Sequence, residues 1–271
     1  MTQKILYFAH FYHQQFKIWT AVQFQYRVAM IIWLIGIIIS PVMYMVVWSN
    51  VAAANGGSVG GYNASNFAAY FIATMVVNHL AYTWHMWEYD TIIRQGLLSP
   101  RLLRPLHPIH ADIAENLSYK TITSVVMIPA TIALILIFDP IWNPAVWSLV
   151  IFVPALILAY FIQFLFGWAL AIMAFWTTRI MALNRMYFLG KLFLSGQIAP
   201  LPLLPPLIQT IAVFTPYPWM IYFPTQLFLN QLTPGEAMRG LGIQLIWVIA
   251  GLILMKLTWR AGVKRYAAFG A

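Results

Sequence analysis

Hydrophobic residues fall into long runs separated by short polar segments, and this pattern predicts an all-α membrane protein. Residues 28–49 contain no charge, and about 20 apolar residues suffice for a helix to cross a bilayer. Comparable runs predict five more spans, so we expect six in total. The other five are residues 67–87, 121–138 and 145–178, a span that begins after Arg185, and residues 240–259.

Residues 4–27, which precede the first span, predict an amphipathic helix. Its apolar positions recur at helical spacing on one face: Ile5, Phe8, Ala9, Tyr12, Phe16 and Trp19. His10, Gln14 and Lys17 lie on the other face. Such a helix rests at the level of the lipid headgroups without spanning the membrane. The alternative is a helix packed on a protein partner, but a span follows directly, which favours the membrane interface.

Proline dominates the segment 200–224, which is nevertheless strongly apolar. Its seven prolines are Pro200, Pro202, Pro205, Pro206, Pro216, Pro218 and Pro224. No continuous helix tolerates that density, and broken backbone at membrane depth must be buried in protein or line a wet cavity. We therefore expect a short pair of re-entrant half-helices between spans five and six. Residues 50–66, 139–144 and 225–239 are expected to be loops or turns.

Composition agrees with lipid as the main solvent. Only 8% of the residues are charged and 62% are hydrophobic, whereas about a quarter of an average soluble domain is charged. No cysteine is present, which excludes a disulfide framework and cysteine-based metal sites. The net charge of +9 follows membrane topology rather than nucleic-acid binding, because the basic residues flank apolar runs.

The distribution of basic residues also predicts the orientation. With six spans and both termini on one side, fourteen of the fifteen Lys and Arg residues fall on that side, and Arg239 falls alone on the other. The positive-inside rule makes the richer side the cytoplasm. A model with five or seven spans would break this segregation.

Residues 88–120, here called the elbow, form a charged island between the second and third spans. They hold four of the six carboxylates. Ser99 is a suitable helix N-cap and Pro100 suits the first helical position, while Pro105 forces its predecessor out of helical geometry. We therefore expect a short helix over residues 100–104, with Gly96 as a flexible joint before it.

This short helix has an apolar surface that it cannot bury alone. Leucines supply it, and arginines surround it: Leu97, Leu98, Leu102, Leu103 and Leu106, with Arg94, Arg101 and Arg104. An exposed apolar patch with a charged rim is typical of a protein docking site. The alternative is a basic loop lying on anionic lipid headgroups.

The sequence offers little for catalysis or metal binding. The six carboxylates lie at span ends or in loops, and no P-loop for ATP hydrolysis is present. The histidines form separate pairs, and we expect the pair His107 and His110 to be solvated and His79 to hydrogen-bond inside the bundle. We expect no catalytic residue and no metal site, and a secondary transporter is disfavoured because it usually needs a buried ionisable group near mid-membrane.

Two segments resemble a known family. They are the run from Ile93 through Gly96-Leu97-Leu98 to Leu102-Leu103-Arg104-Pro105-Leu106, and the segment from Gly196 to Pro205. They are similar to the permease subunits of bacterial ABC exporters of the second exporter type, especially the small permeases related to antibiotic and drug exporters. The resemblance covers most of the chain, so residues 1–271 are expected to form a single transmembrane permease domain.

The resemblance implies that ATP hydrolysis and transport are carried out by separate chains. The elbow residues would contact a separate ABC ATPase that binds ATP and magnesium, and the proline-rich segment would help close the outer gate. The implied contact residues are Arg94, Gly96, Leu97, Leu98, Arg101, Leu102, Leu103, Arg104 and Pro105, and the gate residues are Pro200, Pro202, Pro205, Pro206 and Pro216. The permease would pair with a second copy or a related permease in the bacterial inner membrane.

The uncharged, aromatic interior suits an apolar or amphipathic substrate that moves outward. Two other functions stay open from the residues alone. A non-transporting membrane scaffold would need no ATPase, and a multi-span membrane enzyme would need polar residues that converge at one membrane depth.

Overall fold

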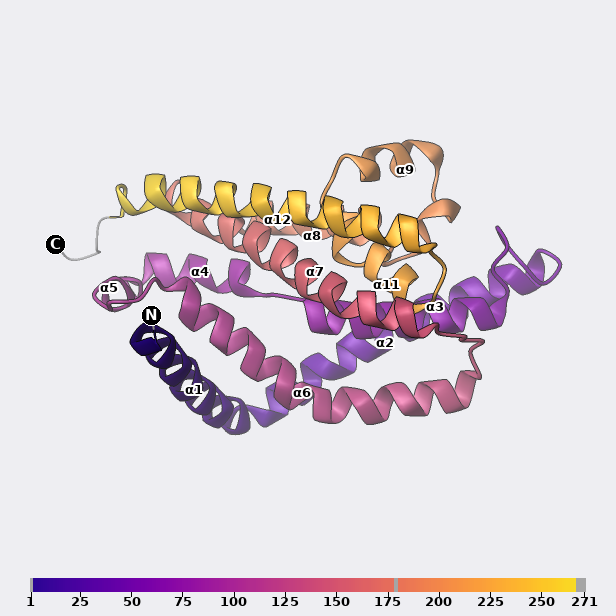
Figure 1. The fold of residues 1–271 in the computed structure, drawn as a ribbon, viewed down its shortest axis with the longest axis horizontal. Helices are drawn as coiled ribbons and strands as arrows, with labels where there is room; N and C mark the ends of the chain where they lie inside the picture. The colour runs from indigo at the N-terminus through magenta and orange to yellow at the C-terminus, as the bar shows by residue number, and fades with distance from the viewer. Residues whose placement is uncertain (1, 178–179, 267–271) are drawn as a thin grey trace.

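The structure, a computed structural model, describes residues 2–177 and 180–266. These residues form helices and turns without a named strand; Val59 and Tyr62 make an isolated β-bridge. Figure 1 shows an elongated bundle in which the elbow, the start of α1 and the end of α12 lie at one end. The loop between α2 and α3 lies at the opposite end. The all-α prediction is confirmed.

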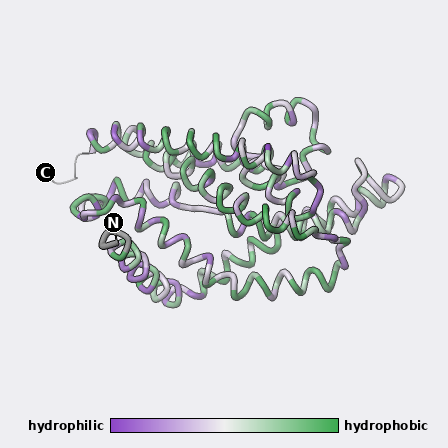
Figure 2. The backbone as a smooth tube through the Cα atoms, viewed as in Figure 1, coloured by the Kyte–Doolittle hydropathy of each residue, from purple (hydrophilic) through white to green (hydrophobic). Residues whose placement is uncertain are grey.

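Four of the described helices are long and apolar enough to cross a membrane. They are α2 (Arg27–Ala54), α6 (Ile109–Phe138), α7 (Val146–Ile172) continued by a 3-10 turn (Met173–Phe175), and α12 (Pro234–Val263). Hydrophobic stretches follow these helices in Figure 2. Large apolar side chains such as Trp33, Leu136 and Ile246 are exposed on them. A soluble protein rarely exposes so much apolar surface, so lipid contact explains it.

Two of the expected spans are shorter helices. α3 (Ala64–Ala81) has 18 residues and α8 (Ile180–Leu194) has 15. At 1.5 Å per residue α8 reaches about 22 Å, less than the hydrocarbon core of about 30 Å. The count of six spans therefore stays a prediction. Thr178 and Arg179, which belong to the expected fourth span and the basic link after it, lie outside the described residues.

The expected continuous helix over residues 67–87 is wrong. α3 ends at Ala81, residues 82–84 are not helical, and α4 (His85–Arg94) follows. Side chains from other helices contact the backbone on both sides of the break. The amine of Lys120 donates to the carbonyl of Tyr82, and the amide of Asn184 donates to the carbonyl of Met86 in the first turn of α4 at 2.6 Å. A broken helix is tolerated inside a membrane protein when neighbouring protein groups supply such partners.

Three predicted loop boundaries are also wrong, because capping residues and helical segments lie inside the expected loops. α2 continues to Ala54, and the side chain of Asn63 already caps α3, so the expected loop 50–66 shrinks to 55–63. α12 begins at Pro234 instead of residue 240, because Thr233 and Glu236 form a capping box. α6 begins at Ile109 instead of residue 121, so much of the elbow is helical.

The N-terminal helix α1 (Thr2–Gln25) packs along α6. The hydroxyl of Tyr12 lies 2.9 Å from Nδ1 of His110, and the hydroxyls of Thr20 and Ser118 are 3.1 Å apart. Phe16 and Trp19 are partly buried, whereas His10 and Lys17 are exposed. The predicted helix is present, and Phe16 and Trp19 of its expected apolar face have partners within this chain, whereas Phe8 of the same face is exposed. Its place at the membrane interface stays a prediction.

The proline-rich segment forms short helices separated by breaks. They are a 3-10 turn (Leu201–Leu203), α9 (Pro206–Val213), α10 (Tyr217–Met220) and α11 (Tyr222–Phe228). α9 projects from the bundle in Figure 1. α10 and α11 pack against α7, and the amide of Gln244 in α12 donates to the carbonyl of Trp219 at 2.8 Å. The predicted breaks are confirmed, while re-entry into the membrane stays a prediction.

Candidate coupling site at the elbow

The elbow folds into α4, the one-turn helix α5 (Ser99–Leu102) and the first turns of α6. Gly96 joins α4 to α5 with φ of +72°, a left-handed conformation that favours glycine. The expected N-cap at Ser99 is wrong, because Leu98 already has helical torsions and Ser99 is the first residue of α5. The hydroxyl of Ser99 instead lies 2.8 Å from that of Tyr266. The elbow therefore contacts the segment that follows α12.

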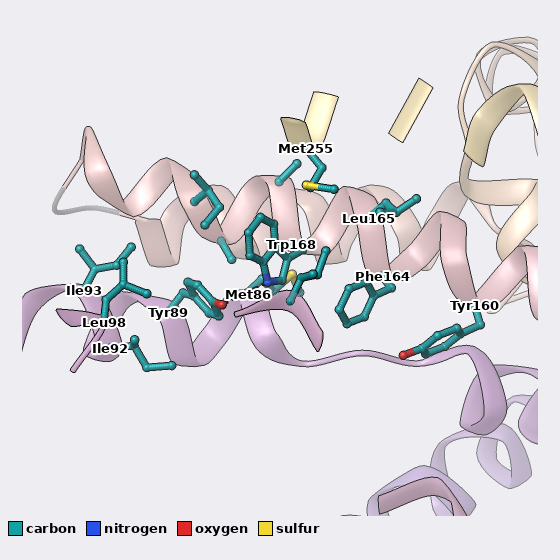
Figure 3. Close-up of a cluster of buried hydrophobic side chains, with 14 residues drawn as sticks. Met86, Tyr89, Ile92, Ile93, Leu98, Tyr160, Phe164, Leu165, Trp168 and Met255 are labelled. Atoms are coloured by element: carbon teal, nitrogen blue, oxygen red, sulfur yellow. Dashed lines mark hydrogen bonds between the residues drawn. The ribbon is translucent and has the colours of Figure 1, made fainter. Parts of the chain in front are cut away.

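Leu98 anchors the elbow in the protein core. Its side chain is 0% exposed and belongs to a cluster with Tyr89 and Ile93 of α4 and with Phe164 and Trp168 of α7. Figure 3 shows this cluster, with Trp168 and Tyr89 pointing toward one another. The expectation that Leu98 lies on the exposed apolar surface is therefore not met, because α5 turns this side chain inward.

Asp112 connects three elements of the site. The hydroxyl of Tyr89 in α4 and the indole Nε1 of Trp168 in α7 both donate to its Oδ2, the latter at 2.9 Å. The guanidinium of Arg101 in α5 donates to its Oδ1 at 2.9 Å. The carboxylate is buried, so these partners replace its lost hydration. One side chain of α6 thus holds α4, α5 and α7 together.

Other predicted contact residues remain accessible. Leu97 is 50% exposed and Leu103 is 88% exposed. Arg94 pairs with Asp90 and remains half-exposed, and Arg104 and Pro105 are exposed. Gly96, Arg101 and Leu102 are partly buried. The elbow therefore presents apolar and basic groups on the surface while its underside is attached to the bundle.

A groove of about 510 Å³ runs between α1 and the elbow. Tyr7, Phe11 and Trp19 line it from α1, and Arg101 and Arg104 line it from the elbow. His107 also lines the groove, and its ring packs against the indoles of Trp168 and Trp259. His107 and His110 therefore have separate aromatic or hydroxyl partners, and both remain partly exposed.

Glu88 lies near Asp112, and its burial lowers the stability of the folded protein by an amount that depends on pH. Burial and the nearby charge of Asp112 raise the pKa of Glu88 from 4.5 to about 7. The folded state thus favours the neutral acid, and its stability falls as pH rises from the unfolded pKa through the folded one. We expect Glu88→Gln to stabilise the protein by about 1–3 kcal/mol at about pH 8 and to have little effect at about pH 4.5. Thermal unfolding of the purified variant at both pH values tests this, and an equal shift at both would contradict it.

Comparison with known proteins identifies the family. Residues 34–270 match the family model described as "ABC-2 family transporter protein". The chain belongs to this family. No curated protein matches it. The family resemblance expected from the sequence is confirmed, and with it a membrane-spanning permease subunit of an ABC transporter, a class that works with an ABC ATPase in the membrane.

The predicted gate residues of this ABC-2 permease lie away from the elbow, around α9. Pro200 is buried, Pro216 is partly buried, and the others are exposed: Pro202, Pro205 and Pro206. Two hydrogen bonds attach the start of the segment to the bundle: the hydroxyl of Tyr70 donates to the Gly196 carbonyl at 2.6 Å, and the indole of Trp48 donates to the Ile198 carbonyl at 2.9 Å. The structure does not bring these prolines together with the elbow.

Two lysines of the permease lie where sequence reasoning did not place them. Lys120 and Lys191 are expected among the cytoplasmic basic residues, yet both are buried in the protein. The amine of Lys120 reaches the carbonyl of Tyr82, and that of Lys191 lies 3.0 Å from Oδ1 of Asn78. Neither has a carboxylate partner within residues 2–177 and 180–266. His79 hydrogen-bonds Thr123 at 3.2 Å, as predicted.

Proposed function

We propose that this permease is the membrane subunit of an ATP-driven exporter and that a separate ATPase docks on residues 94–105. Leu97 and Leu103 offer exposed apolar contacts, and Arg94 and Arg104 lie beside them. Leu98 and Asp112 attach the same segment to α4, α6 and α7. A movement of the docked ATPase would therefore be passed to the bundle. The attachment through Asp112 is the observation that favours this function most.

The ATPase would bind ATP and magnesium, and two permeases, either two copies or a related pair, would line the transport pathway. α3 with residues 82–87 would form the second of six spans and α8 the fifth. The elbow and both termini would face the cytoplasm of a bacterium, across its inner membrane, and the prolines around α9 would help close the outer gate. The aromatic interior suits an apolar or amphipathic substrate, which would move outward.

Two other functions lead to different expectations. A scaffold subunit would tolerate changes at the elbow and would not retain an ATPase during purification. A membrane enzyme would need a converging set of reactive groups that is open to substrate. Tyr89 and Trp168 are buried and hydrogen-bonded to Asp112, which favours a structural connection over catalysis.

The double variant Leu97→Asp/Leu103→Asp tests the docking surface. Both side chains are exposed, so the change should leave the fold intact while it places charge in an apolar contact. We expect recovery of the co-expressed ATPase with the tagged permease to fall at least about tenfold, since loss of central apolar contacts typically costs 2 kcal/mol or more. Ser58→Asp, exposed in the loop at the opposite end, is the charge control. Undiminished co-purification of the double variant would refute the docking assignment.

A further inference from the structure

We propose that His85, Asp112 and Glu115 form a site for a divalent transition-metal ion, with zinc as the best match. His85 opens α4, and the two carboxylates lie on α6. One ligand atom from each of the three side chains lies within 4.8 Å of the other two, and all three residues are buried. Imidazole and carboxylate groups are the ligands that zinc accepts beside thiolate.

His85 is the observation that points to a ligand. The residue is 2% exposed, and neither ring nitrogen makes a hydrogen bond of normal geometry, although the backbone of Asp112 lies close to the ring. The ring stacks on Trp84 at a centroid distance of 5.3 Å and meets the edge of Phe164 at 5.4 Å. These contacts hold the ring but do not satisfy its nitrogens. A buried polar group without a partner is costly, and a metal ion would remove that cost at one nitrogen.

The carboxylates supply the matching ligands. A carboxylate has about four lone-pair positions, and donors occupy three of those on Asp112: two at Oδ2 from Tyr89 and Trp168, and one at Oδ1 from Arg101. Oδ1 thus keeps a free position, while the three donors fix the orientation of the group, as outer partners do in metal sites. Glu115 follows three residues later on the same helical face. It makes no side-chain hydrogen bond to another described residue.

Charge balance also favours a cation. Arg101 offsets one of the two buried carboxylates, and Glu115 has no basic partner among the described residues. A divalent ion would offset the remaining negative charge, whereas two close carboxylates without a cation repel each other.

The three ligand atoms lie within 4.8 Å of one another, and small side-chain rotations would bring them to the distances that zinc requires. Zinc binds nitrogen and oxygen at about 2.0–2.2 Å, so two of its ligands lie at most about 4 Å apart. Three protein ligands leave a fourth position for water. An ion here would join the first residue of α4 to α6, directly after the non-helical residues 82–84. The occupant that competes with it is a proton shared among the same three side chains.

Metal content of the full-length protein tests the site and does not require transport activity. Purified protein in detergent is stripped with a chelator and dialysed against zinc, and cobalt(II) replaces zinc for visible absorption spectra. We expect about one zinc per chain and a cobalt spectrum typical of nitrogen and oxygen ligands. His85→Gln and Glu115→Gln keep side-chain volume and should each weaken zinc binding at least about tenfold. Size-exclusion chromatography shows whether each variant stays folded.

The matched control is His10→Gln/His13→Gln, which removes two exposed histidines on α1 and should leave the stoichiometry unchanged. A wild-type protein that retains no zinc would overturn the proposal even if a variant misfolds. So would zinc binding that survives His85→Gln but disappears in the control, because the ion would then sit on α1. A proton as the only occupant predicts the first of these results.

Discussion

Replacing Asp112 by alanine is expected to lower the free energy of unfolding by about 3–5 kcal/mol, the range for removal of one partner from a buried ion pair. The carboxylate is 1% exposed and accepts from Arg101, Tyr89 and Trp168. Alanine leaves a largely buried guanidinium, a hydroxyl and an indole without their acceptor. Because these donors come from three elements, we also expect α5 to detach from the bundle.

Thermal unfolding in detergent and hydrogen exchange of the amides in α5 measure the two effects. Asp90→Ala is the matched control: it breaks an ion pair on the same elbow, but its partner Arg94 is half-exposed. Such pairs contribute about 0–1 kcal/mol. Equal destabilisation by the two variants, or unchanged exchange in α5 of Asp112→Ala, would show that Asp112 does not hold the elbow.

Gly196→Ala is expected to destabilise the start of the proline-rich segment by about 2–4 kcal/mol. Gly196 has φ of +80°, and an added Cβ would lie 2.7 Å from the hydroxyl of Tyr70 and 3.0 Å from Cδ2 of Tyr222. The left-handed conformation alone costs a non-glycine residue about 1–2 kcal/mol. Displacement of Tyr70 would add the loss of its hydrogen bond to the Gly196 carbonyl, about 0.5–1.5 kcal/mol net.

Gly61→Ala is the control that separates the steric cost of an added Cβ from the cost of the left-handed backbone conformation. Gly61 has φ of +84°, and nothing lies within 4 Å of its would-be Cβ. It should therefore show only the conformational cost. Thermal unfolding of both variants gives the comparison, and protease accessibility around residues 196–205 localises the change. If Gly61→Ala destabilises as much as Gly196→Ala, the close approach of Tyr70 has no energetic role.

Much of the fold was predictable because lipid leaves a strong pattern in the sequence. Uncharged runs mark α2, α7 and α12, and the density of prolines around Pro205 and Pro206 predicts the breaks that the structure contains. The elbow was found from charge alone. Capping residues would have improved the boundaries: Thr233 and Glu236 form a capping box inside a segment expected to be a loop.

The attachment of the elbow could not be predicted, because it depends on side chains that meet only in the folded chain. Trp168 reaches Asp112 across 56 positions of sequence, and nothing local indicates that pairing. Leu98 reads like its neighbour Leu97 in the sequence, yet α5 turns one inward and leaves the other exposed. The spacing of Asp112 and Glu115 on one helical face was a usable signal, but their third partner, His85, lies on another helix.

The non-helical residues 82–84 also determine how the elbow is oriented. A continuous helix would fix the angle between α3 and α4 through its own backbone ladder, which is stiff. Here that ladder is interrupted, and Lys120 and Asn184 from distant helices hold the two sides of the gap. Lys120 and Asn184 therefore contribute to the tilt of α4 relative to α3, together with the packing of α4 on α7. A substitution at either residue, far from α5 in sequence, is expected to change the orientation of the elbow.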